Sequence, residues 1–177
     1  DVSGNSSTAT VTVIVQDTTP PSLTVPTNVV VECSAQGGQA VTIGQATGSD
    51  ICGPVTITND APGTFSLGTI QVTWTATDGS GNKTTGTQDV TVEDTTKPSL
   101  TVPANVAVEC SAQGGQAVDI GQATATDICD ASPVITNDAP ATFSLGSTTV
   151  TWTATDGSGN STSGTQTVTV EDTTPPE

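Results

Sequence analysis

Aspartate and asparagine side chains recur in a short motif that has the oxygen ligands of a metal site. The stretch DGSGN occupies residues 78–82 and 156–160, and the chain opens with the related DVSGN. Calcium prefers carboxylate and amide oxygens of this kind. The motif is not an EF-hand, because the loop position that requires Gly is Lys83 and the position that requires Glu is Asp89. Asp-Gly and Gly-Asn also favour hairpin turns, so each stretch predicts a turn whether or not it binds an ion.

The residues that common catalytic mechanisms need are scarce. The chain has no His, no Tyr and only two basic residues, so the usual pairs of nucleophile and base are missing. Two carboxylates can hydrolyse a glycosidic bond, but the acidic residues here fall in turns and linkers and not in one cleft. We therefore expect no enzymatic activity.

The net charge of −16 limits the partners of the chain. Such a surface repels nucleic acid and anionic membranes, and no segment is long and apolar enough to insert into a bilayer. Cations are the natural partners of this field. The chain also lacks the basic start and apolar stretch of a signal peptide, so we expect a mature piece of a longer protein.

The four cysteines indicate an oxidising compartment. They have no CxxC spacing and no histidine beside them, which argues against zinc. Structural disulfides in an extracellular or cell-surface protein explain them better. The cysteines are Cys33, Cys52, Cys110 and Cys129.

The sequence contains the same repeat unit twice, together with a further partial copy. VECSAQGGQAV begins at residues 31 and 108, and VTWTATDGSGN begins at 72 and 150. Within a unit apolar residues alternate with polar ones, as in IQVTWTATD at 70–78, and Gly and Pro clusters separate these runs, which is typical of strands in a small sandwich. The predicted segments are a last strand of a preceding repeat at 1–17, repeats at 18–94 and 95–172, and the start of a linker at 173–177.

These motifs resemble the hyalin-repeat (HYR) family across essentially the whole chain. VTWTATDGSGN, the following EDTT, the VECSA stretch and the SDIC and TDIC stretches carry the resemblance. It implies an all-β fold of tandem immunoglobulin-like β-sandwich domains, arranged as beads on a string in an extracellular rod.

The chain departs from the family at a second pair of cysteines that members often carry. Val25 and Gly86 stand at those places in the first repeat, and Val102 and Gly164 in the second. Because both halves of that pair are missing together, the resemblance supports intra-repeat disulfides that pair Cys33 with Cys52 and Cys110 with Cys129. Each would stabilise its repeat by on the order of 3 kcal/mol.

In an immunoglobulin-like sandwich the incoming linker lies at the same end as the B–C and F–G loops. Three carboxylates that meet there repel one another unless a cation lies between them. We therefore predict calcium at the junctions; the alternative is plain turns with solvated acidic residues. The predicted ligands are Asp17, Asp50, Asp78 and Asn82 for the first repeat, and Asp94, Asp127, Asp156 and Asn160 for the second.

Three glycosylation sequons share the turn position. They begin at Asn5, Asn82 and Asn160, and a glycan is geometrically feasible at each. The alternative is that the sequon is a by-product of the turn motif.

The function predicted from these features is structural. Sandwiches joined by short DTTPP linkers, with calcium at the junctions and disulfides within the repeats, would form the stalk of a surface adhesin or the body of a filament, whose partners are neighbouring repeats or copies of the same protein. The alternative is a carbohydrate- or protein-binding module of a secreted enzyme or adhesin, although both Trp residues fall on an inward face. Residues 8–16 form an apolar strand that belongs to a preceding repeat or is exchanged with a neighbouring molecule.

Overall fold

The computed structural model describes residues 2–4 and 6–176, and within these it contains β-strands and no helix. The all-β class is therefore confirmed. The strands of the first repeat are β1 (Ser22–Thr24), β2 (Val29–Glu32), β3 (Thr47–Ser49), β4 (Thr56–Asn59), β5 (Gly68–Thr77) and β6 (Lys83–Glu93). Those of the second are β7 (Ser99–Thr101), β8 (Val106–Glu109), β9 (Thr124–Thr126), β10 (Val134–Asn137), β11 (Gly146–Thr155) and β12 (Ser161–Glu171).

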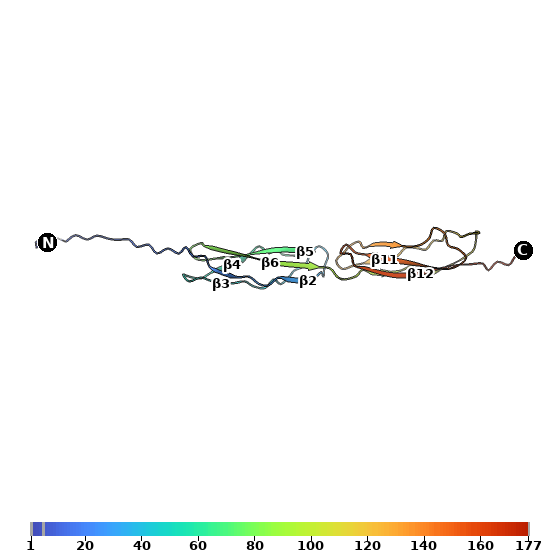
Figure 1. The fold of residues 1–177 in the computed structure, drawn as a ribbon, viewed down its shortest axis with the longest axis horizontal. Helices are drawn as coiled ribbons and strands as arrows, with labels where there is room; N and C mark the ends of the chain where they lie inside the picture. The colour runs from blue at the N-terminus through green and yellow to red at the C-terminus, as the bar shows by residue number, and fades with distance from the viewer. Residues whose placement is uncertain (1, 5, 177) are drawn as a thin grey trace. The chain divides into compact units, whose positions relative to one another are not determined.

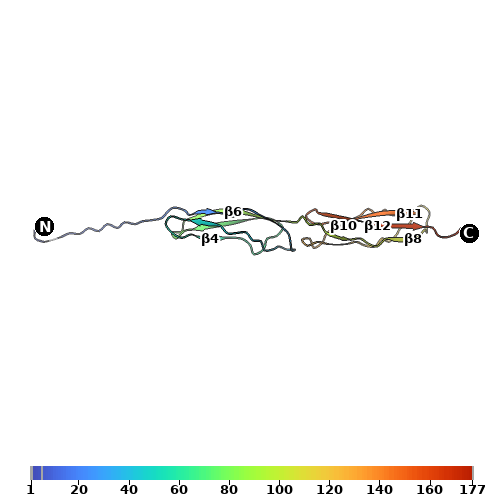
Figure 2. The ribbon, with the colours of Figure 1, turned by 90° about the horizontal axis from the view of Figure 1, so that it is seen from below.

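The two repeats have the same topology. Each combines a four-stranded sheet, in the order β2-β6-β5-β4 or β8-β12-β11-β10, with a two-stranded sheet, β1-β3 or β7-β9. The long strands β5 and β6, and β11 and β12, are the two central strands of the larger sheets; Figure 1 labels all four, and Figure 2 shows the ribbon turned by 90°. The strand pairs β2-β6 and β8-β12 are parallel, and the pairs β1-β3, β4-β5, β7-β9, β10-β11 and β11-β12 are antiparallel. The sequence repeat is thus a repeat of immunoglobulin-like sandwiches.

The core of each sandwich follows the predicted alternation of apolar residues. In the second repeat Val150 and Ala154 of β11 and Val168 of β12 are fully buried, and Trp152 between them is 5% exposed. The residues between them on each strand point outward and are mostly Thr or Ser, because successive side chains of a strand lie on opposite faces of the sheet. The first repeat buries the equivalent residues of β5 and β6.

A buried glutamine crosses each core and was not singled out from the sequence. Gln166 is fully buried; its Oε1 accepts a hydrogen bond from Trp152 Nε1 (3.1 Å), and its Nε2 donates to the backbone carbonyls of Ala104 (2.7 Å) and Ile120 (2.9 Å). Gln88 makes the same three kinds of bond in the first repeat. This side chain ties loops that have no ladder partner to the central sheet.

Gln166→Leu is expected to lower the free energy of unfolding by about 2–3 kcal/mol, because it leaves an indole N–H and two carbonyls buried without partners. Urea denaturation measures the change. The matched control is Gln122→Leu at an exposed position, where a shift within about 0.5 kcal/mol is expected. Equal effects of the two substitutions would contradict the role given to Gln166.

The chain divides into two compact units whose boundary does not follow the sequence repeat. One comprises the chain up to Asn28 together with Ile43–Ala61 and Gln71–Asp89. The other comprises Val29–Thr42, Pro62–Ile70 and the chain from Val90 onward. The segment of the first repeat that carries Cys33 therefore belongs to the same compact unit as the second repeat.

The apolar strand expected at residues 8–16 has no strand pairing in the structure. Val11, Val13 and Val15 are 80–94% exposed, whereas Val168 and Val170, which occupy the equivalent places of Val13 and Val15 in the second repeat, are buried. The partner of this segment, a preceding repeat or a neighbouring molecule, stays a prediction.

Candidate metal and disulfide site

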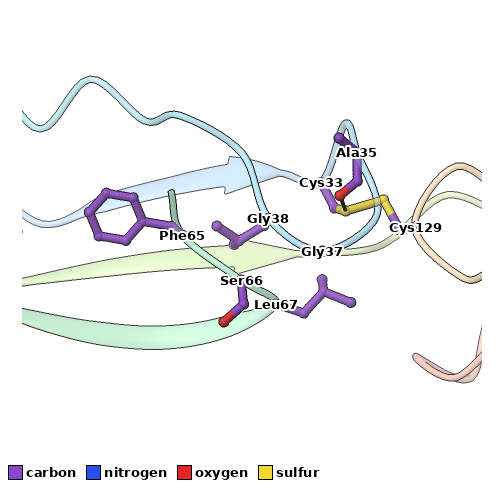
Figure 3. A pocket seen from close by; sticks show the side chains of 9 residues that line it. Cys33, Ala35, Gly37, Gly38, Phe65, Ser66, Leu67 and Cys129 are labelled. Carbon is purple, nitrogen blue, oxygen red and sulfur yellow. Dashed lines mark hydrogen bonds between the residues drawn. A yellow bond between two sulfur atoms is a disulfide. The ribbon is translucent and has the colours of Figure 1, made fainter. Parts of the chain in front are cut away.

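The disulfide of the structure joins Cys33 to Cys129, across 96 residues of sequence, with their Cα atoms 6.2 Å apart. Figure 3 shows the sulfur–sulfur bond beside the loop that carries Ala35 and Gly37. Cys52 and Cys110 are free thiols. The predicted intra-repeat pairing of Cys33 with Cys52 and of Cys110 with Cys129 is therefore wrong.

The physical reason is visible in the second repeat, where the two cysteines lie at opposite ends of β12. The Cys110 N–H donates to the carbonyl of Glu171, the last residue of that strand. Cys129 clusters with Asp94, whose carbonyl accepts a hydrogen bond from Asn160, the residue before that strand. The strand has 11 residues, which places the two ends roughly 30 Å apart. A disulfide needs Cα atoms within about 7 Å, so Cys110 and Cys129 cannot bond to each other, and the partner of Cys129 comes from the first repeat.

Two carboxylates and a sulfur meet beside this disulfide. One ligand atom each from Asp94, Asp127 and Cys129 lie within 4.8 Å of one another. Asp94 is only 8% exposed, and its Oδ2 is a buried atom with no hydrogen-bond partner among the described residues. Its Oδ1 accepts a hydrogen bond from the Thr96 N–H (3.2 Å). An anionic oxygen that is buried and unpartnered is costly unless a cation compensates it.

The first repeat has the same arrangement around a free thiol. Asp17, Asp50 and Cys52 bring their ligand atoms within 4.8 Å of one another. Partial desolvation, together with the negative charges of Asp17, Asp50 and Asp78, raises the pKa of the Cys52 thiol above its ordinary value. Of the three carboxylates predicted to meet in this repeat, Asp17 and Asp50 lie together, and the Cys52 sulfur is the third member of the cluster.

The DGSGN stretches form the predicted turns. In the first, the Asp78 N–H donates to the Asn82 carbonyl, and Asp78 Oδ1 accepts hydrogen bonds from the N–H groups of Ser80 and Asn82. Desolvation acts to raise the pKa of Asp78, but the hydrogen bonds from Asn82, Ser80 and Gly81 outweigh it and hold the pKa below its ordinary value. The carboxylate is therefore kept ionised by its own turn.

Asn82 and Asn160 connect the turns to the linkers. Asn160 Nδ2 donates to Asp156 Oδ2 (3.0 Å) and to the carbonyl of Asp94 (3.0 Å), and Asn82 bonds Asp78 and Asp17 in the same way. A glycan on Nδ2 would remove one of these donors, so at these two sequons glycosylation competes with the turn. The third sequon, Asn5, lies outside the described residues.

Sequence reasoning missed three features of the site. Asp130 belongs to the longer CDASPV stretch of the second repeat; its Oδ2 accepts a hydrogen bond from the Gly157 N–H (2.8 Å), so it joins the loop of Cys129 to the hairpin. The length difference between the two repeats was the signal for it. Cys129 itself was assigned to a disulfide but not placed beside the acidic residues.

The third missed feature is the glutamate of the VEC stretch, which holds the linker through hydrogen bonds. Glu109 accepts hydrogen bonds from the N–H and hydroxyl of Thr173 (2.8 Å each) and from the Thr174 hydroxyl (3.1 Å). Glu32 holds Thr95 and Thr96 similarly. The backbone hydrogen bond from Thr173 is the largest cause that lowers the pKa of Glu109 below its ordinary value of 4.5. The threonines of the recurring DTT stretch therefore connect the linker to the glutamate of the VEC stretch by hydrogen bonds.

These hydrogen bonds make stability depend on pH in a defined direction. Because the pKa of Glu109 is lower in the folded than in the unfolded state, its contribution is fully present above pH 4.5 and is lost as the pH falls through the folded-state pKa. Glu109→Gln is expected to lower the melting temperature near neutral pH and to have a smaller effect at acidic pH, once Glu109 of the folded chain is protonated. Thermal melts across this range test it, with Glu171→Gln, an exposed glutamate at the end of β12, as the control; a difference independent of pH would contradict the assignment.

The sequence also matches a known domain family and two known proteins. The HYR domain model matches residues 16–92 and 93–170. Hyalin of Strongylocentrotus purpuratus is 38% identical over 192 residues, which cover 100% of this chain and 16% of hyalin, and hyalin of Lytechinus variegatus is 36% identical over 99% of this chain and 36% of its own length. The chain thus spans about a third or less of these relatives.

Among solved structures, human protocadherin-24 EC1-2 matches 88% of this chain and 100% of its own, with 14% identity and a TM-score of 0.38, below the level that shows a shared fold. The described residues contain no helix long and apolar enough to cross a membrane.

Two consecutive matches to one family model account for nearly the whole sequence. This chain therefore belongs to the HYR domain family, as two tandem repeats.

Proposed function

We propose that this chain is a structural segment of an extracellular tandem-repeat protein, in which calcium at the acidic clusters and a disulfide restrict movement between successive repeats. The observation that carries the proposal is the buried Oδ2 of Asp94, which has no hydrogen-bond partner in the described structure and lies in a cluster with Asp127. Asp94 is the linker residue before the second repeat, and Asp127 lies in a loop of that repeat. An ion bound to both would fix the linker to the repeat that follows it.

The chain is extracellular or on the cell surface, as its membership of the HYR family and its similarity to the hyalins indicate. The disulfide is consistent with this, because disulfides persist in oxidising compartments. Extracellular calcium modules bind at about 10⁻⁴–10⁻³ M, which suits this setting.

The donor set fits a hard cation better than a soft one. The carboxylates of Asp94 and Asp127 supply oxygen, which calcium prefers. Sulfur would favour zinc or copper, but Cys129 is committed to the disulfide. Asp156 and Asn160 adjoin the cluster through the hydrogen bond to the Asp94 carbonyl and complete the predicted set.

The structural role is favoured over catalysis and over sugar binding. Trp74 and Trp152 are 4% and 5% exposed and donate to buried glutamines, so neither offers an aromatic face for stacking on a carbohydrate. The clustered carboxylates have no histidine, arginine or tyrosine in the chain to work with. We therefore infer a role that rests on mechanical connection between repeats.

Calcium is expected to raise the melting temperature of the intact chain, with a stabilisation of about 1–3 kcal/mol at concentrations ten to a hundred times the Kd. Calorimetric melts in EDTA and across a calcium titration measure it. Asp94→Asn is expected to abolish the calcium-dependent part of the shift, because it removes the charge that the ion compensates. In EDTA the same variant should be at least as stable as the unmodified chain, since repulsion with Asp127 is relieved.

Asp119→Asn is the matched control, because this aspartate is exposed and lies outside both clusters. It should retain the full response to calcium. A melting temperature that stays constant well above millimolar calcium would reject the ion and leave the clusters as acidic turns. A response that survives in Asp94→Asn and in Asp127→Asn would place the ion elsewhere.

A further inference from the structure

The hollow that receives Cys129 at the end of the first repeat recurs at the end of the second, where it holds no cysteine. The first is lined by residues that include Cys33, Gly37, Gly38 and Leu67 and has a volume of about 230 Å³, with Cys129 among its walls (Figure 3). The second is lined by Cys110, Ala112, Gln113, Gly114, Gly115, Ser144 and Leu145 and has a volume of about 510 Å³. All of these residues lie in one compact unit.

We propose that this second hollow is a docking site for the loop Asp50–Cys52 of a second copy of the chain, and that Cys110 of one copy forms a disulfide with Cys52 of the other. The internal Cys33–Cys129 bond is the pattern for it. The copies would join through unlike surfaces, Cys110 of one and Cys52 of the other, so each member of a bonded pair keeps one thiol with which to bond a further copy.

The loop that carries Cys110 already has the geometry of the loop that carries the bonded Cys33. The Cys110 Sγ lies 3.6 Å from the Ala112 carbonyl oxygen, and the Cys33 Sγ lies 3.5 Å from the equivalent oxygen of Ala35. Gly115 and Gly38 have φ of +116° and +117°, so the two loops follow the same path. The Cys110 thiol therefore has the same orientation relative to its loop as the bonded sulfur of Cys33.

The loop that carries Cys52 likewise matches the loop that carries the bonded Cys129. The Cys52 N–H donates to Asp50 Oδ1 (2.8 Å), and the Cys129 N–H donates to Asp127 Oδ1 (2.7 Å). Both loops therefore present the cysteine from the same turn, and Cys52 is exposed.

The side chains around the bonded pair show what docking would cover. Ile128, beside Cys129, is 53% exposed, whereas its equivalent Ile51, beside the free thiol, is 92% exposed. Leu67, beside the bonded cysteine, is 47% exposed, and its equivalent Leu145 is 64% exposed. Gln36 Nε2 donates to the Asp127 carbonyl (3.5 Å) at the bonded junction, and Gln113 would donate to Asp50 of the second copy. The surfaces around Cys52 and Cys110 therefore carry the apolar and polar groups that the bonded junction uses.

The bond forms by exchange with a low-molecular-weight disulfide, for which oxidised glutathione is the probe. The Cys110 thiolate attacks one glutathione sulfur and forms a mixed disulfide, and a glutathione thiolate leaves. The Cys52 thiolate of the second copy then attacks the Cys110 sulfur and releases the second glutathione. The two protons of the protein thiols pass to the two glutathione thiolates, so one oxidised glutathione is reduced for each protein disulfide.

The test is oxidation of the full chain with glutathione in EDTA, followed by electrophoresis without reductant. The unmodified chain should give a ladder of dimers, trimers and longer species. Cys52→Ser alone and Cys110→Ser alone should stay monomeric, and a mixture of the two variants should give dimers and nothing longer. Peptide mapping of the ladder should find Cys52 joined to Cys110, and Leu145→Asp should slow the cross-linking severalfold while leaving the Cys33–Cys129 bond intact.

Three outcomes would overturn the proposal: a monomeric unmodified chain, dimers of either single variant as abundant as those of the mixture, or peptide maps that show all pairings of the two thiols. The proposal rests on the disulfide connection between repeats in the proposed function, but EDTA excludes calcium from the experiment. A chain that shows no response to calcium can therefore still form the ladder, and the two ideas fail separately.

Discussion

Cys129→Ser is expected to lower the free energy of unfolding of the compact unit that contains both bonded cysteines by about 4 kcal/mol. The cross-link spans 96 residues, so its loss returns a large conformational freedom to the unfolded chain. For a domain of this size the change corresponds to a fall in melting temperature of at least about 10 °C. Scanning calorimetry without reductant measures it.

Cys52→Ser is the matched control, because Cys52 occupies the equivalent position as an exposed free thiol. Its effect is expected to stay within about 0.5 kcal/mol. Reduction of the unmodified chain should reproduce the melting temperature of Cys129→Ser. If Cys52→Ser destabilised the chain as much as Cys129→Ser, both would have to be bonded, and the connectivity found here would be incorrect.

The second large effect concerns the places where family members often carry another pair of cysteines. A Cβ built on Gly86 would lie 2.5 Å from Val25 Cγ2 and 3.8 Å from Val25 Cβ. Gly86→Ala is therefore expected to lower the free energy of unfolding by about 1–3 kcal/mol, because the stiff valine side chain cannot move away freely. Conversely, Val25→Cys with Gly86→Cys removes the clash, and the Cβ separation suits a disulfide, for which about 3.8 Å is the mean.

The oxidised double variant is expected to exceed the unmodified chain by about 4 kcal/mol, because the new loop closes about 60 residues. A Cys52→Ser background prevents that thiol from competing. Gly79→Ala is the control for the single substitution, since no atom lies within 4 Å of its Cβ position. A neutral Gly86→Ala, or a double variant that stays reduced in air, would show that the two strands are further apart than described.

Much of the fold could be predicted because the signals are local. The alternation in β5 and β11 places Val72, Trp74 and Val150 inward, as they are in the structure. The sequence repeat predicted the number of sandwiches, because two segments of similar sequence adopt the same fold. Gln88 and Gln166 were not predicted as core residues, because a glutamine among threonines is usually exposed and its partners are backbone carbonyls far away in the sequence.

The cysteine pairing could not be derived from the sequence for a related reason. Four cysteines allow three connectivities, and the pattern does not say which end of a sandwich each loop occupies. Cys110 and Cys129 are close in sequence but separated by the length of β12. The acidic cluster was predictable in part: the linker and loop aspartates were expected together, whereas the buried Oδ2 of Asp94 depends on packing.

The most direct test of this account is a disulfide map of the purified chain, digested without reductant after free thiols are blocked, and read by mass spectrometry. The account predicts one cross-linked peptide pair that contains Cys33 and Cys129, with Cys52 and Cys110 recovered as blocked thiols in monomeric protein. A map that joins Cys33 to Cys52 and Cys110 to Cys129 would contradict it, because each disulfide would then lie within one repeat and none would connect one repeat to the next.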